Sequence, residues 1–133
     1  MPIGDPQGGL FEYTVEGLPE SIFACIIPVS DLSVSKEFYS EILGMVELGS
    51  EGDSVYMSRG QCRVVLKKSD EVGIDTHVVF GVDSPYNTRR RLIDLDVEFV
   101  IDPIRGPFGT HTAFLDPDGN IVHVIEQGAE FRI

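Results

Sequence analysis

The chain carries the same order of predicted elements twice, and this duplication constrains its fold more than any other feature. Short apolar segments at residues 22–29 and 76–82 have the length and composition of buried strands. Each is followed by a predicted helix, over residues 33–43 and 85–95. Three further short segments follow each helix and are predicted as strands: 45–48, 54–57 and 62–66 in the first half, and 96–100, 110–115 and 121–125 in the second.

Both predicted helices have start signals, and the first also has a stop signal. Asp31 or Ser33 can cap the first helix, and Gly44 stops it. Ser84 can cap the second helix, with Pro85 at its first helical position. The first helix also has one apolar face, made by Phe38, Tyr39, Ile42 and Leu43.

The fold class that follows is α+β, with two tandem βαβββ units. The helix of a unit covers one face of its sheet, and the concave other face has to meet a second unit, so that two units form a cup. We expect an N-terminal arm at residues 1–20, one domain at 21–127 and a C-terminal tail at 128–133. Within the domain, the first unit spans 21–68 and the second spans 74–127.

Length and charge exclude several classes of protein. A chain of 133 residues has room for one compact domain. Its 22 acidic and 10 basic side chains give a net charge of −12, which repels phosphate backbones and anionic lipid surfaces. No apolar run is long enough to span a bilayer, and the first residues lack the features of a signal peptide. We therefore expect a cytoplasmic protein with neither a nucleic-acid nor a membrane partner.

The two cysteines lie in separate apolar segments. Cys25 and Cys62 do not form a CxxC pair. We expect both to be buried free thiols, with a disulfide between them as the alternative.

Two segments at matching places in the duplicated units resemble a known family. Residues 29–39 (VSDLSVSKEFY) with 42–45 (ILGM), and residues 114–120 (FLDPDGN), are similar to the vicinal oxygen chelate superfamily. Its members include glyoxalase I, extradiol dioxygenases, fosfomycin-resistance transferases and bleomycin-resistance proteins. The resemblance covers about residues 21–127 and implies the paired-unit fold. It also implies a homodimer, since small relatives complete their cups across subunits.

In metal-dependent members of this superfamily, the resemblance implies four metal-ligand positions, one in the first and one in the last strand of each unit. In the second unit these positions fall on His77 and His123, whose imidazoles can bind zinc, iron, nickel or manganese. In the first unit they fall on Ala24 and Val65, which cannot bind a metal. His123 stands where the superfamily usually has glutamate.

Strand alternation suggests how the three histidines of the chain could meet. A hairpin closed at residues 116–120 pairs Leu115 with Ile121, Ala113 with His123 and His111 with Ile125. His111 and His123 then share a face, and His77 joins them if the strand order of the superfamily holds. Among nearby carboxylates, Asp75 has the right parity to face them and Glu126 does not. The alternative is that each histidine is half-buried in the sheet or hydrogen-bonded to neighbouring backbone, and a register slip of one residue would turn His111 away.

Four further site candidates follow from residue chemistry and position. Without a metal, His123 can serve as an acid or base near neutral pH, and Tyr56 is the second catalytic candidate. Arg63 could anchor a carboxylate or phosphate, and Phe108 in the loop at 106–109 could line the mouth of the cup. The alternatives are a core position for Tyr56, a solvated Arg63 and a plain turn at Phe108.

Three functions remain open at this level. The first is a glyoxalase-like enzyme, of lyase, isomerase or dioxygenase type, in which a divalent metal polarises a small oxygenated metabolite. The second is a metal-free protein of bleomycin-resistance type that binds or sequesters a ligand, for which the net charge of −12 favours a cation. The third is a regulatory module with a vestigial cup.

Overall fold

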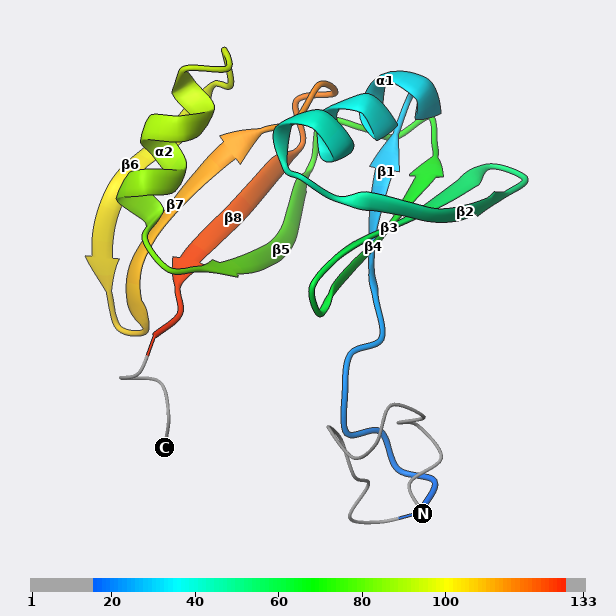
Figure 1. The fold of residues 1–133 in the computed structure, drawn as a ribbon, viewed down its shortest axis with the longest axis horizontal. Helices are drawn as coiled ribbons and strands as arrows, with labels where there is room; N and C mark the ends of the chain where they lie inside the picture. The colour runs from blue at the N-terminus through cyan, green and yellow to red at the C-terminus, as the bar shows by residue number, and fades with distance from the viewer. Residues whose placement is uncertain (1–15, 129–133) are drawn as a thin grey trace.

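The computed structural model describes residues 16–128 and contains two four-stranded sheets (Figure 1). The strand orders are β1-β4-β3-β2 and β5-β8-β7-β6, and only the outer pairs β1 with β4 and β5 with β8 are parallel. The α+β fold of two βαβββ units is thereby confirmed, and in each unit the last strand lies between the first and the third. The strands are β1 (Cys25–Val29), β2 (Val46–Glu51), β3 (Ser54–Arg59), β4 (Cys62–Lys68), β5 (Asp75–Val82), β6 (Phe99–Gly106), β7 (Gly109–Leu115) and β8 (Ile121–Glu126).

The first helical stretch has two parts, α1 (Leu32–Glu37) and the π-helical turn η1 (Phe38–Ile42). Asp31 is the cap, because its carboxylate accepts hydrogen bonds from the backbone N–H groups of Ser33 and Val34. Gly44, with φ +74°, ends the stretch as predicted. The wider π turn changes which side chains point inward, and Tyr39 becomes completely buried.

The second helix, α2 (Pro85–Ile93), ends two residues earlier than predicted, and the strand after it begins later. The Val97 N–H donates to the Leu92 carbonyl, and Asp96 has φ +66°, so residues 94–97 close the helix instead of starting a strand. The prediction of a strand at 96–100 was therefore wrong in position, since β6 spans Phe99–Gly106. Ser84 caps α2 as expected.

The strand predicted at 22–29 begins only at Cys25. Its pairing with β4 starts at Cys25 opposite Val64, and the Phe23 carbonyl accepts its hydrogen bond from the Arg63 guanidinium, not from a strand backbone. Residues 16–24 have no regular structure and extend away from the body of the molecule as the blue segment of Figure 1. Residues 1–15 of the expected arm and 129–133 of the expected tail lie outside the described residues.

Each helix covers one face of its own sheet, and the two units share a core. The first cluster of buried side chains comes from β1, β3, β4, Tyr39 and Met45, and the second comes from α2, Val97, β7 and β8. Phe38, Leu43 and Phe80 pack against both clusters. The two units are therefore held together by apolar contacts on the helix side.

Cys25 and Cys62 are half-buried free thiols. Cys25 lies opposite Val64, so Cys62 is two residues further along β4 on the same face. Strand spacings put such diagonal Cα atoms about 8 Å apart, beyond the reach of a disulfide. Burial, and then the neighbouring Cys25, raise the pKa of the Cys62 thiol.

A buried polar network joins the β7–β8 turn to the first unit. The Asp116 carboxylate accepts hydrogen bonds from the Tyr39 hydroxyl at 2.9 Å and from the Asn120 amide at 3.0 Å. Asn120 also donates to the Pro28 carbonyl at 2.8 Å. Burial and the nearby Asp116 raise the pKa of Tyr39 far above its ordinary value, so the hydroxyl stays protonated and donates. The geometry of this turn therefore depends on residues from both units.

Replacing Tyr39 with phenylalanine is expected to lower the free energy of unfolding by about 2 kcal/mol, because a buried carboxylate loses a hydrogen-bond donor. Tyr86→Phe is the matched control, since the Tyr86 side chain is largely exposed and should lose almost nothing. Urea unfolding at one protein concentration measures both variants. Equal stability of the two variants would show that the Tyr39 hydroxyl contributes nothing.

No helix in the described part of the chain combines the length and apolar character needed to cross a membrane.

Candidate functional site

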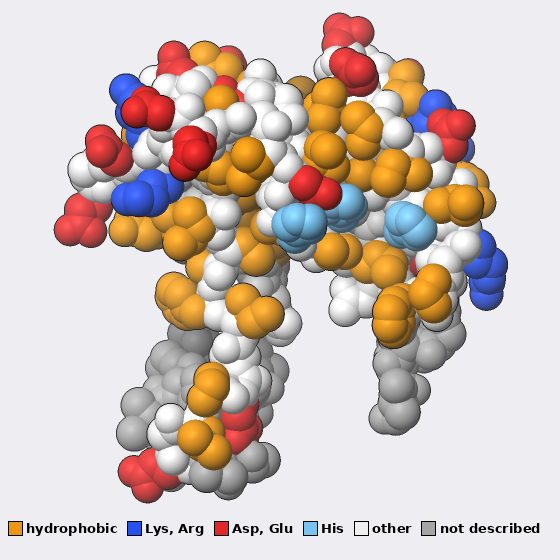
Figure 2. All heavy atoms as spheres, turned by 180° about the vertical axis from the view of Figure 1, so that it is seen from behind, with side chains coloured by type: hydrophobic (Ala, Val, Ile, Leu, Met, Phe, Trp, Pro, Cys, Tyr) orange, Lys and Arg blue, Asp and Glu red, His pale blue; other side chains and the backbone are white. Residues whose placement is uncertain are grey.

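The sheet faces away from the helices carry the predicted site residues. In Figure 2, seen from behind the view of Figure 1, two pale-blue histidine side chains lie beside a red carboxylate and another lies apart from them, with orange apolar side chains around the group. Several large apolar side chains on the strands and the β6–β7 turn are exposed, among them Ile26, Leu48, Val79, Ile104 and Phe108.

The β7–β8 hairpin has the predicted register. Leu115 lies opposite Ile121, Ala113 opposite His123, and His111 opposite Ile125. His111 and His123 consequently share a face and line one cavity of about 220 Å³. Phe108, in the tight turn between β6 and β7, is 68% exposed and forms part of the same lining. The structure thus brings together three of the predicted site residues.

A bulge in β5 places His77 differently. Asp75 pairs with Ile121 and Val79 pairs with His123, so β5 has two more residues than β8 over this interval. Side chains stabilise the bulge: the Asp75 carboxylate accepts from the His77 N–H at 2.9 Å, and the Thr76 hydroxyl donates to the Ile121 carbonyl at 2.7 Å. His77 has φ +59°, in the left-handed region, and its side chain is 83% exposed.

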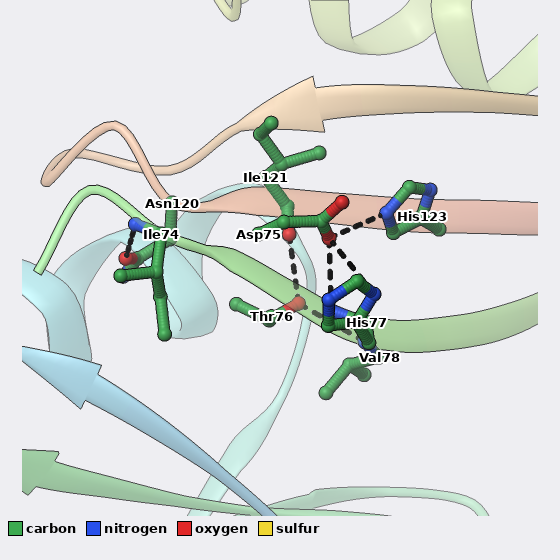
Figure 3. Close-up of polar contacts among 8 residues, drawn as sticks. All are labelled: Ile74, Asp75, Thr76, His77, Val78, Asn120, Ile121 and His123. Carbon is green, nitrogen blue, oxygen red and sulfur yellow. Dashed lines mark hydrogen bonds and ion pairs between the residues drawn. The ribbon is translucent and has the colours of Figure 1, made fainter.

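Asp75 lies between two imidazoles (Figure 3). Its Oδ1 atom is 2.8 Å from His123 Nε2 and 3.7 Å from His77 Nδ1. The His77 backbone N–H, followed by the His123 imidazole, holds the pKa of Asp75 below its usual range. Since an ionised carboxylate can only accept, His123 Nε2 must carry the proton of this hydrogen bond. The alternation of side chains along the strand had indicated that Asp75 could face the histidines, and the structure shows its contact with His123.

A second cavity, of about 310 Å³, lies on the open face of the first sheet. Tyr56 and Arg63 line it, together with the apolar side chains of Phe23, Ala24, Leu48, Met57, Val64 and Val65. The Arg63 guanidinium lies over the Phe23 ring, 4.8 Å from its centroid, and donates to the Phe23 carbonyl at 3.3 Å. Sequence reasoning assigned Phe23 to a strand and missed its place in this cavity.

Comparison of the sequence with models of protein families tests the family membership that the motifs indicated. The model of the Glyoxalase/Bleomycin resistance protein/Dioxygenase superfamily matches residues 21–124. The chain belongs to this superfamily. Its resemblance to the vicinal oxygen chelate proteins is thereby confirmed, whereas no curated protein sequence matches the chain.

Solved structures of the superfamily fold are similar over most of this chain. A lactoylglutathione lyase from Agrobacterium tumefaciens is 23% identical, with a TM-score of 0.70, covering 87% of this chain and 99% of its own. An antibiotic binding protein from a Streptomyces species is 21% identical, with a TM-score of 0.72 and coverages of 83% and 98%. A fosfomycin resistance protein from Listeria monocytogenes is 18% identical, with a TM-score of 0.71 and coverages of 87% and 100%. At these identities the similarity establishes the fold alone.

The residues of this superfamily member do not fit the four-ligand metal site that the resemblance implied. Ala24 and Val65, at the two first-unit positions, have no donor atoms and line the apolar cavity. Within residues 16–128, no group of three or more His, Cys, Asp or Glu side chains has an arrangement that could hold a metal ion.

The predicted site residues thus fall into two places in this superfamily member. His111, His123 and Phe108 line the second-sheet cavity, and His77 lies beside it on the bulge. Tyr56 and Arg63 line the first-sheet cavity. Alternation along single strands could place each residue on the open face, but it could not show which residues share a cavity.

Proposed function

We propose that this superfamily member is a metal-free binding protein that holds a small, largely apolar molecule against the open faces of its sheets. One observation carries the proposal: Ala24 and Val65, at positions where metal-dependent relatives are expected to have ligands, line an apolar cavity of about 310 Å³. This volume is within the range of small-molecule sites, and such sites are mainly apolar with few polar groups. The Streptomyces structure described as antibiotic binding is a precedent for this function on the same fold.

The lining of the cavities indicates the charge of the ligand. Of the described residues that line the first-sheet cavity, Arg63 alone carries a charge at neutral pH. Among residues 16–128, no acidic side chain lines either cavity, so the acidic residues of this part of the chain do not favour a cation there. We infer an aromatic or otherwise flat ligand whose carboxylate, sulfonate or carbonyl oxygen accepts hydrogen bonds from Arg63.

We also propose that the protein works as a homodimer. The open faces expose large apolar side chains on both sheets, including Ile26 and Leu48 on the first and Val79 and Ile104 on the second. Apolar patches of this kind are typical of interfaces, because their burial removes apolar surface from water. A second copy that covers these faces would enclose the cavities.

The dye 8-anilinonaphthalene-1-sulfonate, which joins an aromatic body to an anionic group, is a suitable first probe. We expect saturable binding with increased fluorescence, about tenfold weaker in Arg63→Gln because one charge-assisted hydrogen bond is lost. Val65→Trp, which fills the cavity, should bind still more weakly. Arg91→Gln on the far side of α2 is the matched control. Equal affinity of all four proteins would contradict this site.

The competing function is a metal-dependent lyase, isomerase or dioxygenase, favoured by the close approach of His77 and His123 to Asp75. Elemental analysis of tag-free protein purified without chelator separates the two functions. We expect no stoichiometric metal. About one metal per chain, lost in both His77→Ala and His123→Ala, would contradict the metal-free proposal and favour the enzyme.

A further inference from the structure

The side chain of Asp75, which lies on β5 like His77, occupies the space between the imidazoles of His77 and His123. Asp75 Oδ1 approaches one nitrogen of each ring, at 2.8 Å for His123 and 3.7 Å for His77 (Figure 3). These are the two second-unit positions at which the resemblance implied metal ligands. An internal carboxylate oxygen therefore lies where a cation would have to contact both imidazoles.

The β5 bulge holds Asp75 in this position. The same Oδ1 atom accepts the His77 backbone N–H at 2.9 Å, which closes an Asx turn and sets the rotation of the carboxylate. Thr76 anchors the other side of the bulge, through its 2.7 Å hydrogen bond to the Ile121 carbonyl and its 3.1 Å bond from the Val78 N–H. The orientation of the carboxylate is thus set by the backbone and does not depend on a bound ion.

We propose that the Asp75 carboxylate replaces a metal ion between these histidines, and that it leaves His123 Nδ1 as a fixed hydrogen-bond acceptor for a ligand. This proposal rests on the proposed function, because both require that the ligand of the cup is bound without a metal. Because His123 Nε2 donates to Asp75, Nδ1 is the remaining ring nitrogen, and in the imidazole form of the ring it has a free lone pair. His123 lines the second-sheet cavity, whose other walls are mainly apolar.

This arrangement specifies the chemistry of the group that binds there. An acceptor nitrogen in an apolar cavity pairs with a hydroxyl or amino donor, and a ligand without such a donor would leave the nitrogen unpaired. The Asp75 contact fixes the ring orientation before the ligand arrives, so Asp75 acts as a positioning residue. The second-sheet cavity is therefore suited to an apolar molecule with one hydroxyl or amino group.

Long-range proton–nitrogen NMR of the labelled full-length protein tests the first part of this proposal. We expect a slowly exchanging His123 Nε2–H signal that persists when one equivalent of Zn²⁺ is added. The signal should be lost to solvent exchange in Asp75→Ala, but retained in the control Asp70→Ala and in His77→Ala. Loss of the Nε2 proton on stoichiometric Zn²⁺ binding would overturn the replacement of the ion by Asp75, and so would an unaltered signal in Asp75→Ala.

Phenol and toluene, which differ by one hydroxyl, test the acceptor role with the wild-type protein. We expect phenol to shift the His123 Nδ1 resonance and toluene to leave it unchanged. Equal shifts, or none with either compound, would overturn the acceptor role. Since the dye experiment probes the first-sheet cavity through Arg63, a dye that fails to bind while the Nε2–H signal is present would contradict the proposed function alone.

Discussion

Asn120→Ala is expected to lower the free energy of unfolding by about 3 kcal/mol or more. The Asn120 side chain is completely buried and connects three segments. Its carbonyl oxygen accepts from the N–H groups of Gly73 at 2.8 Å and Ile74 at 3.1 Å, and its amide donates to Pro28 and Asp116. Alanine removes the partner of three part-buried backbone groups, the N–H groups of Gly73 and Ile74 and the carbonyl of Pro28, and one of the donors to Asp116. Each polar group left unpaired away from water costs about 1–3 kcal/mol.

Urea unfolding at a single protein concentration measures this loss, because dimerisation makes apparent stability depend on concentration. The control is Asn87→Ala, the other asparagine of the chain, which lies exposed on α2. We expect the control to change the free energy of unfolding by no more than about 0.5 kcal/mol. If both variants unfold at the same urea concentration, Asn120 does not hold the two units together.

Ile26→Glu is expected to convert the proposed dimer into a monomer, weakening association at least about a hundredfold. Ile26 is 62% exposed on the open face of β1, whereas the next residue, Ile27, points to the other face and is completely buried in the core. If a second copy covers this face, the new carboxylate loses its hydration without gaining a partner, which costs several kcal/mol. In the isolated chain the same side chain remains in water, so the fold should be preserved.

Analytical ultracentrifugation of the variant and the wild-type protein measures this effect against the 14.7 kDa mass of one chain. Val34→Glu is the matched control, since Val34 is 49% exposed on α1, on the helix side. The control should sediment as the wild type does. A wild-type monomer, or an Ile26→Glu variant that remains dimeric, would contradict the proposal that a second copy covers the open faces.

Local signals in the sequence were sufficient for most elements. A hairpin closed at the DPDGN turn was expected to pair Ala113 with His123, with a slip of one residue as the alternative, and the structure has the expected register. The start of β6 was misplaced because residues 96–98 have strand-like composition. Instead, the N–H groups of Asp96 and Val97 donate hydrogen bonds to the Ile93 and Leu92 carbonyls and close the end of α2.

The candidate site was predictable residue by residue but not as an arrangement. His111, His123 and Phe108 were expected at the cup and share one cavity, whereas Tyr56 and Arg63 belong to another. The bulge at His77 has no counterpart in the strand pattern, since it depends on side-chain hydrogen bonds from Asp75 and Thr76. Alternation is read along a single strand. It cannot show that β5 has two residues more than β8 over the same interval.

By itself, the sequence determined the duplicated unit, the cap of α2 at Ser84 and the stop of the first helical stretch at Gly44, because the signals for these features are local. Only the tertiary structure decided that Asn120 joins Pro28 to Gly73, and that the Asp75 carboxylate lies between His77 and His123. Such contacts bring together segments up to 92 residues apart. They form only when segments far apart in the sequence pair or pack, which a local sequence pattern cannot specify.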